Sequence, residues 1–407
     1  MPQNSAVTPR RDWSPDPIVD WLMTAGRALK CPQQLTAQLS RMLVESGAPL
    51  LRVRMSMRTI HPQITGSSYT WWRDRPDVEE YSPPHSILQS SDYQGSPIEA
   101  VQTSGNMFRC RLADADMSQL HSSLQDLHQQ GTTDYVVYPL IQTYESRPAT
   151  WILGTDVIGG FTTNDLDGFA RIATFLASVV EVISLQRSAR SLLNTYLGPR
   201  TGQRVFDGQI KRGDGERIEA VIWYSDLRDF TFISESLPPH DLLKLLNQYF
   251  EAISDAVSAR GGEVLRFIGD AMLVMFPVEH DRTLQQGCRD AVAAARAAQL
   301  AVDKINPQLQ ASGLPSIRYG LGLDVGEVIY GNVGAPNRLD FTIMGPVVNR
   351  AARIEELTKK TGCPVLASEP FALQQPDTFI PRGEFEVQGV QEPLQVYGLQ
   401  SLSGNSR

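Results

Sequence analysis

Two aspartates interrupt apolar, strand-like runs in the C-terminal half of this 407-residue chain. Residues 220–223 are mostly apolar and predict a buried strand that ends at Asp226. Two further apolar runs flank Gly269-Asp270, a two-residue connection with glycine first, which suits a type II′ hairpin turn. If the strands are neighbours, both carboxylates emerge at one sheet edge and form a site for a hard cation such as Mg²⁺. The alternative is a pair of solvated turn aspartates.

The composition is that of an ordinary globular protein with two or three domains. The net charge of −8 argues against broad nucleic-acid binding, because there is no basic surplus to neutralise phosphates. The cysteines are scattered, without a CxxC pair, which fits a reducing compartment and excludes zinc-ribbon spacing. They are Cys31, Cys110, Cys288 and Cys363.

The sequence predicts a cytoplasmic protein without membrane insertion. The longest apolar helical run, residues 172–185, contains Ser178 and Glu181 and is too short to span a bilayer. No apolar core follows Arg10 and Arg11, so no secretion signal is visible.

The N-terminal part is expected to contain a flexible tail at residues 1–15 and an α+β domain at residues 16–163. Helical spacing over residues 17–46 precedes four β-like segments, with a long polar loop predicted at residues 74–105. The β-like segments are residues 50–56, 68–72, 133–141 and 150–157. This order, and residues 151–167 in particular, resembles GAF-type sensory domains; a PAS-like domain is the alternative. The resemblance implies a small-molecule ligand or a protein as the input.

Aromatic side chains in these segments have two interpretations: core or dimer-interface packing, or the lining of a ligand pocket. They are Tyr69, Trp71, Trp72, Tyr135 and Tyr138. Residues 164–215 predict a connecting helix, ended by Gly198 and Pro199, and a polar connector from residue 202 onward. Apolar residues crowd one face of that helix, which suits pairing with a second copy but equally suits packing within the chain.

Residues 216–402 predict a second α+β domain with a ferredoxin-like βαββαβ core. After the Asp226 strand comes an amphipathic helix at residues 238–259, with Leu242, Leu243, Leu246, Phe250 and Ile253 facing inward. The hairpin at Asp270 and a long helix over residues 281–305 follow. A second hairpin is expected over residues 317–330, then a strand at 341–344 and a helix at 346–361.

Asn349 and Arg353 are four residues apart on that last helix and therefore project from one face. An amide and a guanidinium so placed can hold a ribose and a phosphoryl oxygen. The alternative is an exposed helix face with Arg353 paired to Glu355 or Glu356.

Four motifs resemble, in order, those of class III adenylate/guanylate cyclase catalytic domains. They are YSDLRDFT (224–231), FIGD (267–270), GLDVGE (322–327) and FTIMGPVVNRAAR (341–353). The resemblance implies an enzyme that converts ATP to 3′,5′-cyclic AMP and pyrophosphate. It also implies a homodimer with head-to-tail subunits, in which the metal aspartates and the Asn349/Arg353 pair come from different subunits.

The resemblance assigns roles to matching positions. Asp226, Asp270 and the Leu227 carbonyl would hold two divalent cations, Mg²⁺ or Mn²⁺. Phe230 and Thr231 would contact the triphosphate through backbone amides. Asn349 would orient the ribose, and Arg353 would stabilise charge on the α-phosphoryl group.

The family's base-reading positions fall on Arg266 and Thr342. Arg266 can donate to adenine N1 and Thr342 can accept from N6, whereas guanine would be served better by an acidic residue, so ATP is favoured. Three departures stand out: Arg266 replaces a lysine, Gln388-Gly389 replaces a Lys-Gly that contacts the terminal phosphates, and Asp324-Val325 replaces a His-Thr pair.

Three other functions compete with an adenylate cyclase. A guanylate cyclase is disfavoured by Arg266 and Thr342. A diguanylate cyclase should show a Gly-Gly-Asp/Glu-Glu-Phe turn, which residues 261–263 do not complete. A non-catalytic nucleotide-binding dimer would more often have lost Asp226, Asp270 or Arg353.

Overall fold

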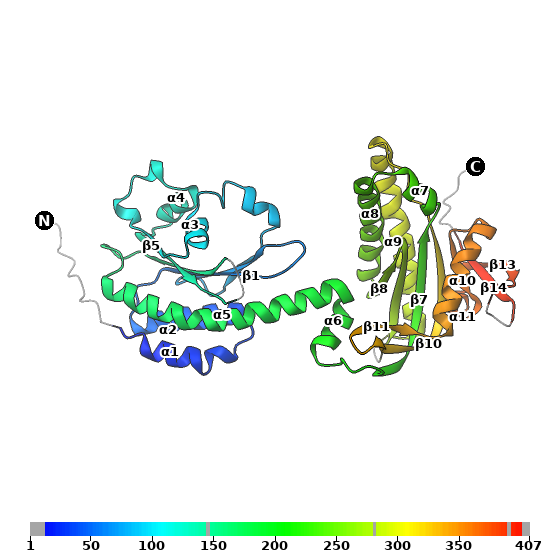
Figure 1. Cartoon of the computed structure of the whole chain (residues 1–407), viewed down its shortest axis with the longest axis horizontal. Helices are drawn as coiled ribbons and strands as arrows, with labels where there is room; N and C mark the ends of the chain where they lie inside the picture. The colour runs from blue at the N-terminus through cyan, green and yellow to red at the C-terminus, as the bar shows by residue number, and fades with distance from the viewer. Residues whose placement is uncertain (1–12, 144–146, 280–281, 389–391, 401–407) are drawn as a thin grey trace. The chain divides into compact units, whose positions relative to one another are not determined.

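The computed structural model describes residues 13–143, 147–279, 282–388 and 392–400 (Figure 1). The chain divides into two compact units, residues 1–192 and residues 193–407. Of the predicted flexible tail, residues 1–15, the first twelve lie outside the described residues. Trp13 corrects the rest of that expectation, because its ring is buried against Phe169 and its Nε1 donates to Asp165 at 2.8 Å.

The N-terminal unit is built on a six-stranded antiparallel sheet of order β3-β2-β1-β6-β5-β4. The strands are β1 (Arg52–Arg58), β2 (Gly66–Trp72), β3 (Glu79–Tyr81), β4 (Phe108–Cys110), β5 (Asp134–Leu140) and β6 (Ala149–Thr155). The helices are α1 (Asp16–Met23), α2 (Pro32–Ser46), α3 (Pro97–Ser104), α4 (Ser122–Gln129) and α5 (Thr163–Leu197). Short 3₁₀ turns are η1 (Gly26–Ala28), η2 (His85–Gln89), η3 (Leu112–Asp114) and η4 (Met117–Gln119).

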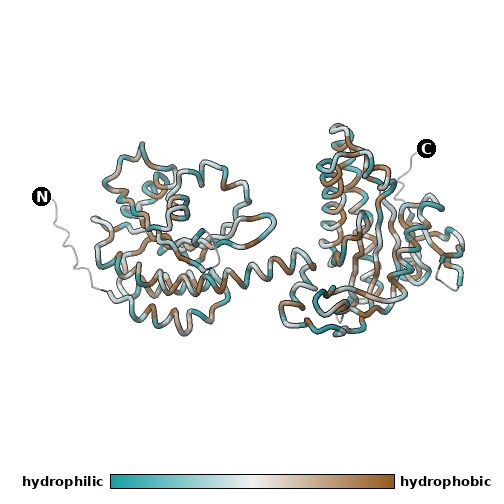
Figure 2. The backbone as a smooth tube through the Cα atoms, viewed as in Figure 1, coloured by the Kyte–Doolittle hydropathy of each residue, from teal (hydrophilic) through white to brown (hydrophobic). Residues whose placement is uncertain are grey.

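Helices cover both faces of this sheet. In Figure 1, α1, α2 and α5 lie on one face, and α3 and α4 lie on the other. Alternate residues of β1 and β2 point into the first layer, where Met55, Tyr69 and Trp71 join the core with Leu39 and Phe169. The hydropathy colouring follows this arrangement, with brown segments along the central strands and helices of the unit (Figure 2).

The predicted long loop at residues 74–105 is wrong in part, because it contains β3, η2 and α3. The α3 helix begins with a sequence signal that could have been recognised: Ser96 accepts from the Glu99 amide as its N-cap, and Pro97 occupies the first position. The aromatic residues divide between the two interpretations. Tyr69, Trp71 and Tyr138 are core residues, whereas Trp72 and Tyr135 line a cavity.

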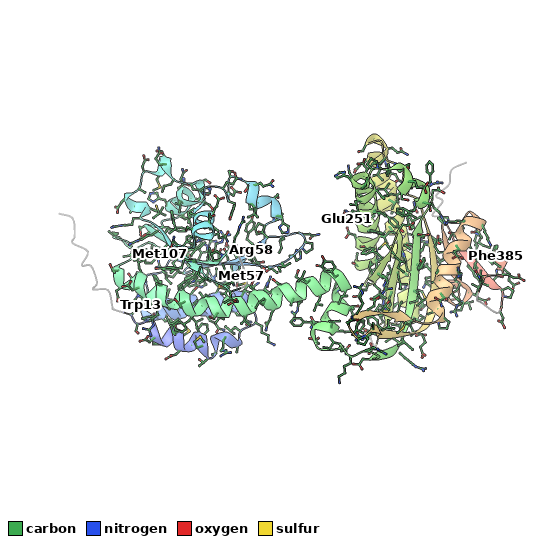
Figure 3. The ribbon with its side chains drawn as sticks, in the orientation of Figure 1. Trp13, Met57, Arg58, Met107, Glu251 and Phe385 are labelled. Atoms are coloured by element: carbon green, nitrogen blue, oxygen red, sulfur yellow. The ribbon has the colours of Figure 1, made fainter. Side chains whose placement is uncertain are left out.

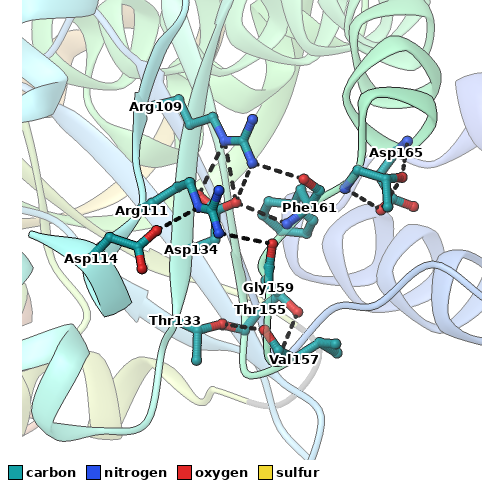
Figure 4. A network of polar contacts seen from close by, with 11 residues as sticks. Arg109, Arg111, Asp114, Thr133, Asp134, Thr155, Val157, Gly159, Phe161 and Asp165 are labelled. Carbon is teal, nitrogen blue, oxygen red and sulfur yellow. Dashed lines mark hydrogen bonds and ion pairs between the residues drawn. The ribbon is translucent and has the colours of Figure 1, made fainter. Parts of the chain in front are cut away.

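A buried carboxylate ties the start of α5 to the sheet (Figure 4). Asp134 of β5 is fully buried and receives the Phe161 amide at 2.8 Å and the Arg109 guanidinium at 2.6 Å. Arg109 of β4 also donates to the Phe161 carbonyl at 2.8 Å. A buried charge is stable only when it is paired and hydrogen-bonded in this way, so strands β4 and β5 fix the segment leading into α5.

The α5 helix spans Thr163–Leu197 and is longer than the apolar run that the sequence indicated, residues 172–185. On length and composition alone it could cross a membrane, which corrects the expectation that the apolar run is too short. However, 56% of its most apolar window is buried within the protein, where Phe169, Ile172 and Leu176 pack into the core. This is the pattern of a core helix.

The C-terminal unit contains an eight-stranded sheet of order β13-β14-β12-β10-β7-β9-β8, with β11 paired to β10. The strands are β7 (Gly215–Leu227), β8 (Glu263–Ile268), β9 (Ala271–Val278), β10 (Tyr319–Ala335), β11 (Arg338–Met344), β12 (Val365–Ser368), β13 (Phe379–Phe385) and β14 (Leu394–Leu399). The helices are α6 (Pro199–Phe206), α7 (Phe230–Ser236), α8 (Pro239–Ser258), α9 (Leu284–Ala311), α10 (Pro346–Thr361) and α11 (Glu369–Ala372). The sequence β7-α8-β8-β9-α9-β10 is the predicted βαββαβ core.

Three details of this unit differ from the prediction. Residues 317–330 do not form a hairpin: β10 is one long strand, and its hairpin partner is β11. The polar connector includes a helix, α6, begun by Pro199. Leu243 of α8 is 60% exposed, while Leu245 and Tyr249 are buried in its place. The other four predicted residues do pack against the core, so the prediction is wrong for Leu243 alone.

Candidate active site

Asp226 and Asp270 meet at one edge of the central sheet. Asp226 is the penultimate residue of β7, and Asp270 lies in the two-residue turn between β8 and β9, beside the β7 strand. Gly269 adopts a left-handed φ of 64° and Asp270 does not, which fits the predicted type II′ turn. Burial, a hydrogen bond to Asp226 and the charge of Asp226 raise the pKa of Asp270 to about 6. The two carboxyl groups therefore lie in direct contact.

This carboxylate pair fits a divalent cation. Two adjacent carboxylates repel each other when both are ionised, and a bound cation removes that repulsion. Among the described residues no cluster of three or more His, Cys, Asp or Glu side chains could hold a metal. Two carboxylates suit Mg²⁺, which usually takes one or two carboxylates together with substrate phosphates and waters and does not need an all-protein cage.

A buried ion pair that the sequence analysis missed lies beside the two aspartates. Arg228 contacts Glu355 of α10 at 3.1 Å and also donates to Thr358. Glu355 is only 2% exposed; burial raises its pKa to about 7, with Arg228 opposing the rise and Asp226 adding to it. Arg228 stands in the motif around Asp226, but no local pattern indicates that its partner is on a helix more than a hundred residues away.

Two glycines of β10 allow α10 to lie directly on the sheet. A Cβ on Gly322 would come within 2.1 Å of the Ala351 carbonyl oxygen, and one on Gly320 would collide with the Arg228–Glu355 pair. The lack of space for a side chain explains why glycine occupies these two positions of the segment that was predicted as a hairpin. The close contact fixes the helix that carries Asn349 and Arg353.

Asn349 and Arg353 lie on α10 as predicted. Asn349 is exposed, and Arg353 is ion-paired with Glu356 at 2.6 Å, which is the alternative that the sequence analysis left open. Among the described residues, no contact joins either side chain to Asp226 or Asp270. Other residues of α10 do lie near the aspartates, because the charge of Asp226 acts on Glu355 and that of Lys359 acts on Asp270.

The predicted phosphate-contacting residues begin the short helix α7. Leu227 is buried at the end of β7, and Phe230 and Thr231 are the first residues of α7. Asp229, between them, has a left-handed φ of 60°, and its carboxylate pairs with Arg318 at 2.5 Å. A non-glycine residue in this conformation is strained, though Asp tolerates it better than most.

The predicted base-reading residues lie on neighbouring elements. Thr342 is buried on β11, and Arg266 of β8 is ion-paired with Asp340, two residues before Thr342 on the same strand face. Asp340 was not predicted. Its carboxylate places an acceptor beside the two positions that were expected to read the base.

Two further positions differ from the family motifs, Gln388-Gly389 and Asp324-Val325, and they lie in different surroundings. Gln388 is exposed, and Gly389 lies outside the described residues. Asp324 is fully buried and accepts from Arg350 of α10 at 2.8 Å. Burial raises the pKa of Asp324, opposed by Ser368 and Arg350. Asp324 thus helps to hold α10 against β10.

Residues 215–401 match the family model described as the adenylate and guanylate cyclase catalytic domain. The C-terminal unit contains a class III cyclase catalytic domain. Its four motifs, its βαββαβ core and the contact between Asp226 and Asp270 agree with that assignment.

The cyclase domain is also similar to curated proteins and solved structures. Adenylate cyclase 1 of Rhizobium meliloti (strain 1021) is 35% identical over 185 residues, 44% of this chain and 27% of that protein. The adenylate cyclase of Anabaena cylindrica is 33% identical over 224 residues, 53% of this chain and 43% of that protein. The crystal structure of the guanylyl cyclase Cya2 is 31% identical and covers 46% of this chain and 96% of that one, with a TM-score of 0.41. The chain therefore spans less than half the length of these two curated relatives.

Proposed function

We propose that this protein is an adenylate cyclase that converts ATP to 3′,5′-cyclic AMP and pyrophosphate. The observation that carries the proposal is the contact between Asp226 and Asp270 at the sheet edge of a cyclase catalytic domain. The 3′-oxygen of the ribose attacks the α-phosphorus, its proton passes to solvent, and the bond from the α-phosphorus to pyrophosphate breaks.

Some residues bind the cations and the substrate, and one stabilises the charge that develops during the reaction. Asp226 and Asp270, with the Leu227 carbonyl, would hold two divalent cations, Mg²⁺ or Mn²⁺. When bound, these cations supply charge that lowers the pKa of the 3′-hydroxyl and neutralises the polyphosphate. The Phe230 and Thr231 amides bind the triphosphate, and Asn349 orients the ribose. Arg353 leaves Glu356 to stabilise the charge on the α-phosphoryl group, which requires breaking only a half-exposed ion pair.

We propose further that the active unit is a homodimer with head-to-tail subunits. Support comes from Arg353, which is paired with Glu356 and makes no hydrogen bond or ion pair with Asp226 or Asp270 among the described residues. Exposed apolar side chains beside the predicted site add to it: Phe267 is 51% exposed, Ile268 43% and Leu339 37%. Such residues on β8 and β11 would be covered by a second copy.

Three functions are candidates: cyclisation of ATP, cyclisation of GTP, and nucleotide binding without catalysis. The two named adenylate cyclase relatives and the donor at Arg266 favour ATP. The pairing of Arg266 with Asp340 favours GTP as a second candidate, because a carboxylate accepts from the guanine N1–H while the guanidinium donates to O6. A regulatory dimer without catalysis is the third candidate, and the intact residues Asp226, Asp270, Asn349 and Arg353 argue against it.

For the N-terminal unit we propose a sensory role of the GAF type in a cytoplasmic protein. The six-stranded antiparallel sheet with helices on both faces is compatible with it. The α5 helix, which continues from this unit to residue 197, would carry the signal.

The decisive experiment incubates the purified full chain with ATP or GTP and Mg²⁺ or Mn²⁺, and identifies the products by chromatography. We expect cyclic AMP from ATP, and no product from Asp226→Ala. Cyclic GMP as the main product would establish the second candidate. If nucleotide binds but no cyclic product forms under any condition, the regulatory dimer is favoured.

A further inference from the structure

A cavity of about 760 Å³ lies in the N-terminal unit, within the size range of small-molecule binding sites. Its lining comes from β1 and β2, from residues 83–98 and from the start of α4. It therefore occupies the sheet face opposite the α5 core layer (Figure 1).

The sequence of β1 gives this cavity a basic lining. Successive strand residues point to opposite faces. Val53 and Met55 enter the core, whereas Arg52, Arg54, Ser56 and Arg58 line the cavity; Met57, at the end of the strand, belongs to the core and also borders the cavity. Figure 3 labels the neighbours Met57 and Arg58 at this end of the strand. The alternation RVRMSMR is thus a core strand on one side and a row of guanidinium groups on the other.

Arg52 carries a buried charge without a counter-ion. Its side chain is 9% exposed and lies over the Trp72 ring, 5.3 Å from the centroid. Among the described residues it makes no hydrogen bond or ion pair, and its Nε has no partner. Burial and then the charge of Arg54 lower the pKa of Arg52 to about 10, so it remains protonated at neutral pH.

Arg54, beside it, is only partly satisfied. Its Nη2 donates to the neutral Ser68 hydroxyl at 2.8 Å, and its Nε has no partner. Burial also lowers the pKa of Arg54. Burying two adjacent guanidinium groups without an anion is unfavourable, and removing such a charge or pairing it would each stabilise the fold.

The acidic side chains around the cavity do not neutralise this pair. Glu79 is ion-paired with Arg75 at 2.6 Å, and the effects of these two charges on the pKa of Arg52 oppose each other. Glu80 is bound to Gln33 and Tyr69, and Tyr69 belongs to the opposite face. Asp92 and Asp126 are exposed at the edge of the cavity. The cavity thus retains two buried positive groups beside an aromatic ring.

The remaining lining is apolar in large part and includes Ile87, Leu88, Ile98, Leu127 and Ile152. We infer that this cavity binds a small organic anion, whose carboxylate or phosphate group is held by Arg52 and Arg54 and whose apolar body lies against these apolar side chains. Both head groups match the planar donor fork of arginine. The inference concerns the N-terminal unit alone and does not depend on the cyclase activity.

The test is isothermal titration of the full chain with three probes that share one ring system: 2-naphthoate, 2-naphthyl phosphate and the neutral 2-naphthamide. We expect at least one anion to bind more than about tenfold tighter than the amide, because charge-assisted hydrogen bonds contribute at that level. The better of the two anions identifies the head group.

Variants separate recognition from folding. Arg52→Met and Arg54→Met should each abolish the preference for the anion without lowering the melting temperature, since each removes an unpaired buried charge. Arg52→Lys keeps the charge and should retain part of the preference. Arg41→Met, at an exposed arginine on α2, is the matched control and should bind as the wild type does. Equal affinity for anion and amide, no anion binding at millimolar concentration, or unchanged preference in both Met variants of the cavity would overturn the inference.

Discussion

At the scale of single residues, the contact between Asp226 and Asp270 has a measurable pH dependence. In the metal-free protein the pKa of Asp270 is about 6, above its ordinary value of 3.8. A carboxyl whose pKa is raised on folding destabilises the folded state when ionised. This cost is fully present above pH 6 and disappears as the pH falls toward 4.

Asp270→Asn should therefore raise the melting temperature of the metal-free protein at pH 7.5 by about 2–4 °C, which is about 1 kcal/mol for a unit of this size. The difference from the wild type should vanish near pH 4. Mn²⁺ should raise the melting temperature of the wild type more than that of the variant, and cyclase activity of the variant should be lost. Equal melting temperatures at pH 7.5, with equal Mn²⁺ effects, would show that the two carboxylates do not interact.

Asp229 places a negative charge at the turn where the triphosphate is proposed to bind. Asp229→Asn removes the charge while keeping a side chain that tolerates the left-handed φ of 60°. One unit charge at 4 Å contributes about 1 kcal/mol in water, so we expect KM for ATP to fall about twofold to fivefold. Initial rates at varied ATP measure this effect. A rise in KM would indicate that the Asp229–Arg318 pair, rather than repulsion, controls the turn.

At the scale of elements, α10 depends on two glycines of the strand beneath it. Gly322→Ala should destabilise the C-terminal unit by about 1–3 kcal/mol or more, because the new methyl group would overlap the Ala351 carbonyl of α10. Gly287→Ala is the matched control: it lies within α9, and its new Cβ would make only ordinary contact, at 3.4 Å, with Val221. The control should be neutral or stabilising. Urea unfolding compares the two, and similar losses in both would contradict a specific role for the close contact.

At the scale of the whole molecule, a shared active site predicts complementation between two inactive variants. Asp270→Ala and Arg353→Ala each disable a different half-site. An equal mixture forms about one half heterodimers, each with one intact site, so about a quarter of wild-type activity should return. Cyclic nucleotide formation after mixing measures it. Activity that stays absent in a mixture shown to exchange subunits would rule out half-sites from different subunits.

The N-terminal unit is expected to set the rate of the cyclase domain. Removing residues 1–190 should change the basal rate per active site, because α5 continues from the N-terminal core into residues 193–197 of the second unit. The comparison is made at equal dimer fraction, measured by sedimentation. An identical rate would count against regulation through this helix.

The sequence by itself determined the βαββαβ order, the turn at Gly269-Asp270, the two aspartates and the extent of α10, because each depends on local apolar periodicity and turn chemistry. It did not determine the pairing of Arg228 with Glu355, of Arg266 with Asp340, or the burial of Arg52. Those depend on segments far apart in the chain that only folding brings together. The same limit explains Gly320 and Gly322: local pattern indicated a turn, whereas the tertiary structure uses both to admit a helix onto the sheet.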